Sequence, residues 1–343
     1  MSIIIVGDYL TQRDDEEGGP FLGGLGKTYK AWMRQIGIDP RQCEFINVID
    51  EPPIGRQSIF GFCGPKEQSI PGLKYVKRGS YLLREYFPKV ERLWKIINTK
   101  KPNLVIAAGE LALWALTSET SLLSARGRIH SGHSGIPGIK VLPTFGPQHI
   151  MGNWPDRMIL LSDLEKARRE AEFPEVRRPQ RFIHLYPSLE DMEDFLNRYI
   201  LPEEFPNLDV DIETKGQMIT CVGFAPSRER AIVIPFYDVM KPDGNYWPTK
   251  REEYLAWCWV RRVLKLGKKV GGQNYQYDMQ YLWRQMGIKS PDFADDTMLL
   301  HHALYPELRK GLGFMASLYT DELPWKFMHK IKVADKTGKK EDE

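Results

Sequence analysis

The sequence predicts an α/β protein of two domains, a parallel-sheet α/β/α domain followed by a mixed α/β domain. Three observations predict this architecture. The first half alternates short apolar strands with amphipathic helices, the second half contains three consecutive strands, and a charged segment with prolines separates the halves. The length of 343 residues is sufficient for two hydrophobic cores of ordinary size.

The first half carries the pattern of a parallel sheet. Buried strands are expected at 2–7, 43–49, 103–109 and 140–145, and amphipathic helices at 26–37 and 80–100. Because parallel neighbours need crossover connections, this alternation predicts helices on both faces of the sheet.

The boundary between the domains is expected in residues 163–180, which are highly charged and include Pro174 and Pro179. We therefore assign residues 1–162 to the first domain, 163–180 to a linker that begins as an exposed helix, and 181–343 to the second domain.

The second half begins with a strand at 181–186 and a helix capped by Ser188. Further strands are expected at 207–214, 217–227, 230–236 and 268–274, and helices at 251–267, 275–287, 297–305 and 312–319. The first three of these strands are separated by turns and predict an antiparallel meander, whereas the charged residues 334–343 are expected to fray.

Composition narrows the class of protein. With 42% hydrophobic and 27% charged residues, the chain is of the globular type, and no apolar run approaches the roughly 20 residues that span a bilayer. The start has no basic leader, and Cys43, Cys63, Cys221 and Cys258 have no zinc-like spacing. A cytoplasmic protein with reduced thiols and no membrane partner is expected, while the net charge of +3 leaves nucleic-acid binding open.

The segment NLDVDIET places two acids on one face of a strand, because Asp211 and Glu213 are two residues apart. Val210 and Ile212 then point into the core. Two adjacent carboxylates repel each other, and a divalent cation such as Mg²⁺ or Mn²⁺ would relieve that repulsion.

A third acid follows in GGQNYQYDMQ, where Asn274 and Asp278 lie four residues apart at a strand-to-helix junction. Tyr275 and Tyr277 between them could stack on a base or pack in the core. Three converging carboxylates predict a two-metal phosphodiesterase site, whereas Asp-x-Glu taken alone fits a solvated strand end equally well.

These motifs, together with residues 294–322, resemble the DnaQ-like (DEDD) exonucleases, and most closely the proofreading domain of family A DNA polymerases. The resemblance implies a ribonuclease H-like fold with Asp211, Glu213 and Asp278 as catalytic metal ligands. It also implies that Thr214, Asn274 and Tyr277 lie near the substrate strand. We expect Asp296 to cap the next helix rather than bind metal.

The family pattern also requires a fourth aspartate in Tyr-x-x-x-Asp or His-x-x-x-x-Asp, which this chain lacks. Tyr319 is followed four residues later by Leu323, and His329 precedes Asp335 by one residue too many. We therefore expect a domain incomplete at its C-terminus, with three explanations open. The chain could be the front of a longer polymerase, a companion chain could complete the site, or the domain could be inactive.

A second resemblance concerns residues 2–160, which carry a glycine-rich loop between the first strand and the helix near Gly26. The chain resembles family 4 of the uracil-DNA glycosylase superfamily in the order of four segments, namely this loop, NLVIAAGELALWAL, RGRIHS and VLPTFGP. The resemblance implies a pocket formed by Asp8, Phe21, Asn47, Gly146 and Gln148. Phe21 would stack on a flipped base or belong to the core, and Arg126 could contact phosphates.

Base excision is not expected from this first domain. Gly146 and Pro147 stand where the family carries His-Pro, and His149 lies too far along the chain to substitute. Only Cys43 and Cys63 lie in this domain, so we expect no iron–sulfur cluster.

The leading hypothesis is the exonuclease portion of a phage-like family A DNA polymerase, with a glycosylase-like DNA-binding domain before it. Its partners would be DNA, as a single-stranded 3′ end or a primer-template, and a polymerase domain or other replication proteins. The alternatives are a non-catalytic DNA-binding or partner-docking module and, more weakly supported, a uracil-DNA glycosylase.

Overall fold

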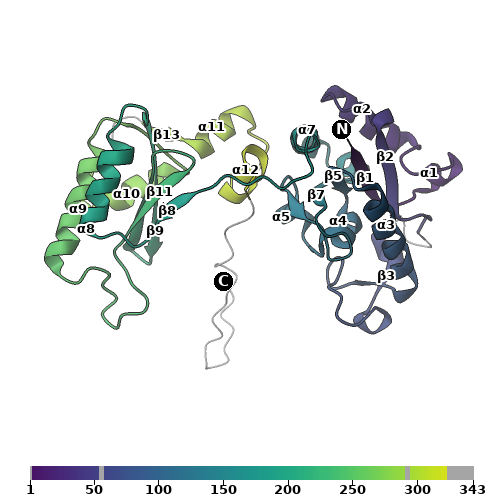
Figure 1. The fold of residues 1–343 in the computed structure, drawn as a ribbon, viewed down its shortest axis with the longest axis horizontal. Helices are drawn as coiled ribbons and strands as arrows, with labels where there is room; N and C mark the ends of the chain where they lie inside the picture. The colour runs from purple at the N-terminus through teal and green to yellow at the C-terminus, as the bar shows by residue number, and fades with distance from the viewer. Residues whose placement is uncertain (1, 54–57, 290–293, 323–343) are drawn as a thin grey trace. The chain divides into compact units, whose positions relative to one another are not determined.

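The computed structural model describes residues 2–53, 58–289 and 294–322 (Figure 1). The chain forms two compact units, the first made of Met1–Arg178 and Gly313–Glu343, the second of Pro179–Leu312. This division differs from the predicted one at two places. The expected linker is helical and packed as far as Glu170, and residues 313–322 belong to the first unit instead of the second. The prediction that a fourth aspartate is missing depends on Leu323, His329 and Asp335. These residues and the charged tail lie outside the described residues.

The first unit is built on a five-stranded sheet in the order β2-β1-β5-β7-β6 (Figure 1). Its strands are β1 (Ile3–Tyr9), β2 (Cys43–Ile49), β5 (Leu104–Ala108), β7 (Lys140–Thr144) and the short β6 (His130–Ser131). β1, β2, β5 and β7 run parallel, and β6 joins the edge antiparallel. A two-stranded ribbon, β3 (Cys63–Gly64) with β4 (Tyr81–Leu82), lies outside this sheet.

Helices cover both faces of this sheet, as the sequence predicts. One face packs against α3 (Phe87–Lys100) and α4 (Glu110–Thr117), the other against α2 (Gly24–Gln35) and α7 (Arg157–Glu170). The shorter helices are α1 (Gln12–Glu16), α5 (Leu122–Ala125) and α6 (Pro147–Gly152). β1 and β5 are almost wholly buried because they receive helices on both sides.

The second unit is built on a six-stranded mixed sheet in the order β13-β12-β9-β10-β11-β8. Its strands are β8 (Phe182–His184), β9 (Asn207–Lys215), β10 (Met218–Ala225), β11 (Arg230–Pro235), β12 (Lys269–Gly272) and β13 (Ala294–Asp296). β9, β10 and β11 form the predicted antiparallel meander, while β8, β12 and β13 are added parallel to their neighbours.

The helices of this unit are α8 (Leu189–Phe195), α9 (Lys250–Leu264), α10 (Tyr275–Met286) and α11 (Thr297–Leu304). Ser188 begins α8 with a capping box, in which its hydroxyl accepts from the Asp191 amide. The core lies on one face of the sheet, where Val210 and Ile212 of β9 pack with Phe195 of α8 and Val260 of α9. The mixed α/β architecture predicted for the two halves is confirmed.

No helix among the described residues is both long enough and apolar enough to cross a membrane.

Candidate functional site

The candidate site of the second unit begins with β9, whose side chains alternate strictly between core and solvent. Leu208, Val210 and Ile212 are buried, whereas Asp211 and Glu213 point out from the opposite face. Asp209 shares that face, so the strand carries three acids in succession on one side. Asp209 was not among the predicted site residues, although the same two-residue period places it with Asp211 and Glu213.

Asp278 reaches this strand from α10. Its Oδ1 accepts a hydrogen bond of 2.8 Å from the backbone N–H of Ile212, the residue between Asp211 and Glu213. The side chain is only 3% exposed. The structure therefore brings the third predicted acid, which is 66 residues away on a helix, to the backbone of β9 between Asp211 and Glu213.

The electrostatic environment of this site is negative. The pKa of Asp278 is raised to about 6: burial raises it most, the Ile212 hydrogen bond lowers it, and the charges of Asp211 and Glu213 add to the rise. Burial also raises the pKa of Cys221, with contributions from the same two carboxylates. A cation at this position would lower all of these pKa values.

Thr214 and Tyr277, predicted to lie near a substrate strand, contact each other. Their hydroxyl oxygens are 2.8 Å apart, and the Tyr277 ring packs against Tyr281 with centroids 4.7 Å apart. Tyr277 is 41% exposed, so one side of its ring faces solvent at the edge of the acidic site. Tyr275 is buried in the core, which resolves the alternative left open for it.

Asn274 occupies the N-cap of α10 with a φ of 55°, a left-handed conformation that asparagine tolerates better than most residues. The backbone N–H of Asn274 donates to the Asp296 carboxylate, and the backbone N–H of Tyr275 donates to the same group. Asp296 also accepts from Met298 and Leu299 and so caps α11, as predicted. One carboxylate thus fixes the start of two helices, of which only the cap of α11 was predicted.

Asp211, Glu213 and Asp278 have the carboxylate chemistry that suits Mg²⁺ or Mn²⁺. Within residues 2–53, 58–289 and 294–322, however, no three His, Cys, Asp or Glu side chains are gathered closely enough to hold a metal ion. The three carboxylates are therefore chemically suitable for a divalent ion, but they would have to move closer to one another to coordinate it.

A hollow of about 360 Å³ adjoins the acids on the same face of the sheet. Asp209 and Asp211 form its polar side, and Ala225, Val233 and Leu312 are among the residues on its apolar side. Gly223, opposite Asp211 in the sheet, leaves this space open because it has no side chain.

The glycosylase-like pocket predicted for the first unit is a small hollow of about 10 Å³. Asp8, Phe21, Asn47 and Gln148 all line it, which brings together four of the five residues predicted for that pocket. Gly146 does not line it and instead caps α6, with Ala108 O 2.8 Å from where a Cβ would lie. A space of this size accommodates about one water molecule and is too small for a pyrimidine base.

Asp8 is engaged within the fold. Its Oδ1 accepts from the Ala112 amide at 2.9 Å and its Oδ2 from the Glu110 amide at 3.2 Å, both in the first turn of α4. Burial raises the pKa of Asp8 to about 7 despite these hydrogen bonds. Gly109, at a φ of 144°, allows this approach, because a Cβ there would overlap the carboxylate.

Phe21 is 5% exposed and has a φ of 57°, which is unusual for an aromatic residue. Its ring packs against Tyr29 and Phe45, with centroids 5.7 Å and 5.2 Å away. The core alternative for Phe21 therefore describes this structure, although the ring also borders the hollow.

Two further predictions about the first unit can be compared with the structure. Arg126 was expected in a loop that could contact phosphates, which is wrong, because its side chain is 1% exposed and paired with Asp163. His149 lies with its Nε2 2.7 Å from Asp156 and its ring stacked on Phe145 at 4.0 Å. The imidazole is thereby held by α6 and the turn after it, and it is absent from the lining of the hollow.

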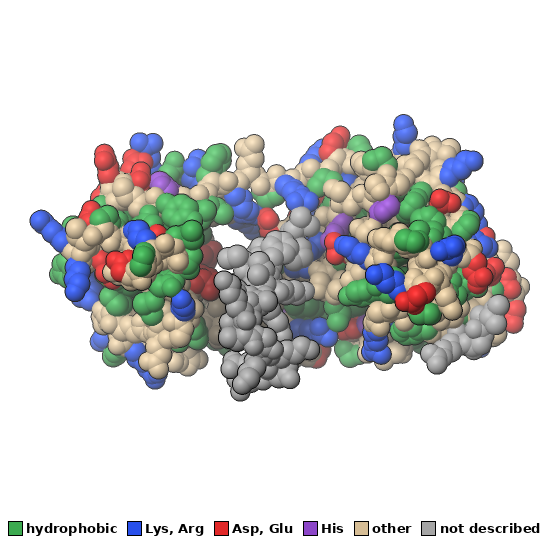
Figure 2. All heavy atoms as spheres, turned by 90° about the horizontal axis from the view of Figure 1, so that it is seen from below, with side chains coloured by type: hydrophobic (Ala, Val, Ile, Leu, Met, Phe, Trp, Pro, Cys, Tyr) green, Lys and Arg blue, Asp and Glu red, His purple; other side chains and the backbone are tan. Residues whose placement is uncertain are grey.

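Among the described residues drawn in Figure 2, basic and acidic side chains are interspersed on the surface of each unit. The described cysteines are all free thiols.

Comparisons with known proteins give one sequence relative and several structural ones. No family model matches the chain. The type-4 uracil-DNA glycosylase of Thermotoga maritima is 29% identical over 171 residues, which are 48% of this chain and 76% of that protein. The EXD2 exonuclease domain soaked in Mn and GMP is 14% identical with a TM-score of 0.28, covering 37% of this chain and 62% of that one. The Aedes aegypti Nibbler EXO domain is 14% identical with a TM-score of 0.27, covering 37% of this chain and 59% of that one. The chain therefore spans less than two thirds of either structure.

Proposed function

We propose that the second unit is a metal-dependent nuclease domain that acts on the 3′ end of DNA, and that the first unit is a glycosylase-like DNA-binding domain without base excision. One observation carries the proposal. The buried Asp278 is hydrogen-bonded to the backbone between Asp211 and Glu213, so three carboxylates from two elements share one negative site.

Asp211, Glu213 and Asp278 would hold Mg²⁺ or Mn²⁺. A bound divalent ion supplies an activated water and stabilises the leaving oxygen of a phosphodiester. The protein's own contribution is to keep Asp278 in place through Ile212 and to present Tyr277 and Thr214 beside the acids. An exposed tyrosine ring at this place suits stacking on an unpaired base.

The first unit supports a binding role better than a catalytic one. Its relative is a uracil-DNA glycosylase, yet both Asp8 oxygens are engaged by α4 and the hollow beside them holds about one water. The motifs of residues 207–322 favour a family A polymerase context, and replication proteins are the partners this context implies.

The test uses a 3′-labelled single-stranded oligonucleotide with Mn²⁺ or with a chelator. We expect slow shortening that requires the metal, and a fall on the order of 100-fold in Asp211→Ala. Asp194→Ala is the matched control, because Asp194 is an exposed acid of α8 that pairs with Arg198. Shortening that persists with chelator, or that survives in Asp211→Ala, would refute the assignment.

A non-catalytic DNA-binding or docking module is the second candidate. It is favoured by the finding that the described acids are not gathered into a three-ligand group. This candidate predicts that the oligonucleotide binds without being shortened at any Mn²⁺ concentration.

A further inference from the structure

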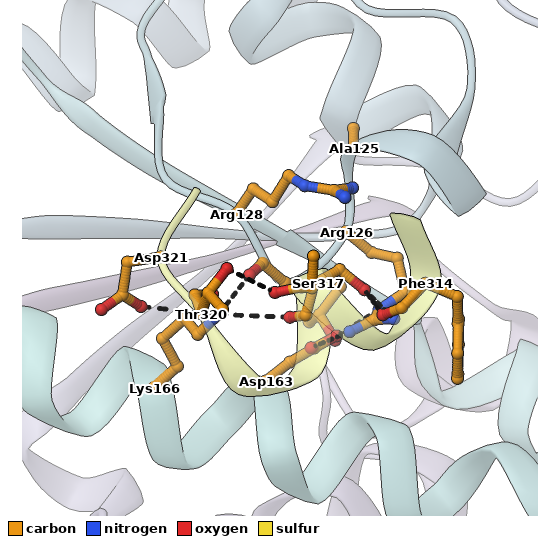
Figure 3. A network of polar contacts seen from close by, with 12 residues as sticks. Ala125, Arg126, Arg128, Asp163, Lys166, Phe314, Ser317, Thr320 and Asp321 are labelled. Atoms are coloured by element: carbon orange, nitrogen blue, oxygen red, sulfur yellow. Dashed lines mark hydrogen bonds and ion pairs between the residues drawn. The ribbon is translucent and has the colours of Figure 1, made fainter. Parts of the chain in front are cut away.

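A buried cluster of charges joins α7 and the segment around Arg126 to residues 313–322 (Figure 3). Arg126, Arg128, Asp163 and Lys166 are each no more than 3% exposed. Residues 313–322 contain all of α12 (Leu312–Tyr319) except its first residue, and they follow the second unit along the chain but pack in the first.

Arg126 and Asp163 form the centre of the cluster. The guanidinium donates to both Asp163 oxygens, at 2.9 and 2.5 Å, and to the Ser317 hydroxyl at 3.0 Å. Thr144 donates to Asp163 at 2.8 Å. Gly127 is required here, because a Cβ would lie 2.6 Å from Asp163 and 2.8 Å from the Ser317 carbonyl.

Arg128 and Lys166 each make two of their three hydrogen bonds to backbone carbonyls of residues 313–322. Arg128 donates to Gly313 O at 2.6 Å and Glu322 O at 3.0 Å. Lys166 donates to Ser317 O at 3.2 Å and Thr320 O at 2.6 Å, and its ammonium lies 3.5 Å from Asp321.

These contacts compensate an excess of positive charge in the part of the cluster that comes from α7 and from the segment around Arg126. The cluster contains three cations, Arg126, Arg128 and Lys166, but only two carboxylates, Asp163 and the half-exposed Asp321. Carbonyls at the C-terminal end of a helix, such as Ser317 O and Thr320 O, carry partial negative charge and stabilise cations. Arg128 also donates to Ser124 O, and Lys166 also donates to Gly127 O. Residues 313–322 therefore supply two of the three backbone acceptors of each cation, and a charge held buried without such partners is strongly destabilising.

We propose that residues 313–322 are a clasp, an obligate element of the first unit that is supplied only after the chain has completed the second. The second unit is then an insertion whose two ends are both anchored in the first unit. The clasp binds through its buried face, Met315, Ala316 and Ser317, and through its carbonyl groups.

The test places a site-specific protease sequence after Gly311, an exposed residue with open space around it, in the full-length chain. After cleavage, we expect the fragment that begins at Leu312 to co-elute with the remainder on native gel filtration. Ala316→Asp, which places a charge on the buried face of the clasp, is expected to speed release of this fragment by at least about tenfold. Ala303→Asp makes the same change at an exposed position of α11 and is expected to leave the fragment bound.

Hydrogen exchange of the uncleaved variants distinguishes loss of the clasp contacts from unfolding of the whole chain. In Ala316→Asp, exchange should accelerate in α7 and in residues 122–128 and remain slow in α9. Prompt release of the unsubstituted fragment, retention of the Ala316→Asp fragment, or accelerated exchange confined to α9 would each overturn the proposal.

Discussion

At the scale of single residues, the ionisation of Asp278 links stability to the proposed metal site. An aspartate has a pKa of 3.8 in the reference state, and the folded environment raises the pKa of Asp278 to about 6. The folded state therefore holds this proton more tightly than the unfolded state. The contribution of Asp278 to stability is largest below pH 4 and is lost as the pH rises through 6.

Replacing Asp278 with asparagine tests this linkage. Asn keeps an oxygen that can accept from Ile212 but cannot ionise, so the variant should gain stability relative to wild type as the pH rises from 4 to 8, by about 2 kcal/mol. Denaturant unfolding followed by hydrogen exchange in α9 measures the difference. Mg²⁺ should stabilise the wild type at pH 8 and leave Asp278→Asn unchanged.

Glu190→Gln, a change at an exposed carboxylate of α8, provides the control and should show no such dependence on pH. If the Asp278→Asn difference is the same at pH 4 and pH 8, the carboxylate is not destabilised by its neighbours, and the negative site is misjudged.

At the scale of helices and strands, Asp296 holds α10 and α11 together at their starts. Its two oxygens accept from the backbone amides of Asn274, Tyr275, Met298 and Leu299. Asp296→Ala removes all four bonds and should destabilise the second unit by about 2 kcal/mol, with faster hydrogen exchange in both helices.

Asp295→Ala is the matched neighbour, because Asp295 forms only a partly exposed ion pair with Lys269, and it should cost less than about 1 kcal/mol. Equal losses in the two variants would show that Asp296 does not fix the helices. Asp296→Asn should be intermediate, since it keeps an oxygen for three of the four amides.

Sequence predicted the elements whose pattern is local. β2, β5 and β7 lie within two residues of their predicted bounds, because apolar runs and strict alternation depend only on neighbouring residues. The approach of Asp278 to β9 between Asp211 and Glu213 was also predictable, because each motif lies on a regular element whose geometry directs its side chains. Among the described residues the three carboxylates are nevertheless not gathered closely enough to hold a metal ion, so the metal site stays a prediction.

The predictions about α7 and Arg126 were wrong for a physical reason. Charged residues usually mark an exposed surface, and the segment DLEKARRE has the composition of a solvated helix unless the donors to Asp163 and the acceptors of Lys166 are known. Those of Lys166 include the carbonyls of Ser317 and Thr320, more than 150 residues later. No local pattern encodes a partner so distant, so the packed end of α7 was taken for a linker.

At the scale of the whole molecule, the two units differ in how much of their expected site remains accessible. The second presents Asp209 and Asp211 beside a hollow of about 360 Å³, whereas the hollow of the first measures about 10 Å³. The proposed function, in which both units bind DNA and only the second alters it, is consistent with this contrast.

That contrast predicts the outcome of incubation with a uracil-containing duplex followed by alkali. Strand scission at uracil should stay at the level without protein, because Asp8 is engaged by α4 and Gly146 offers no side chain to a departing base. Phe21→Gly should leave this result unchanged. It opens the hollow and suits the positive φ, but it restores neither the free carboxylate nor the missing imidazole. Scission that increases with the concentration of the wild-type protein would mean that DNA binding frees Asp8, and the first unit would then be an enzyme in its own right.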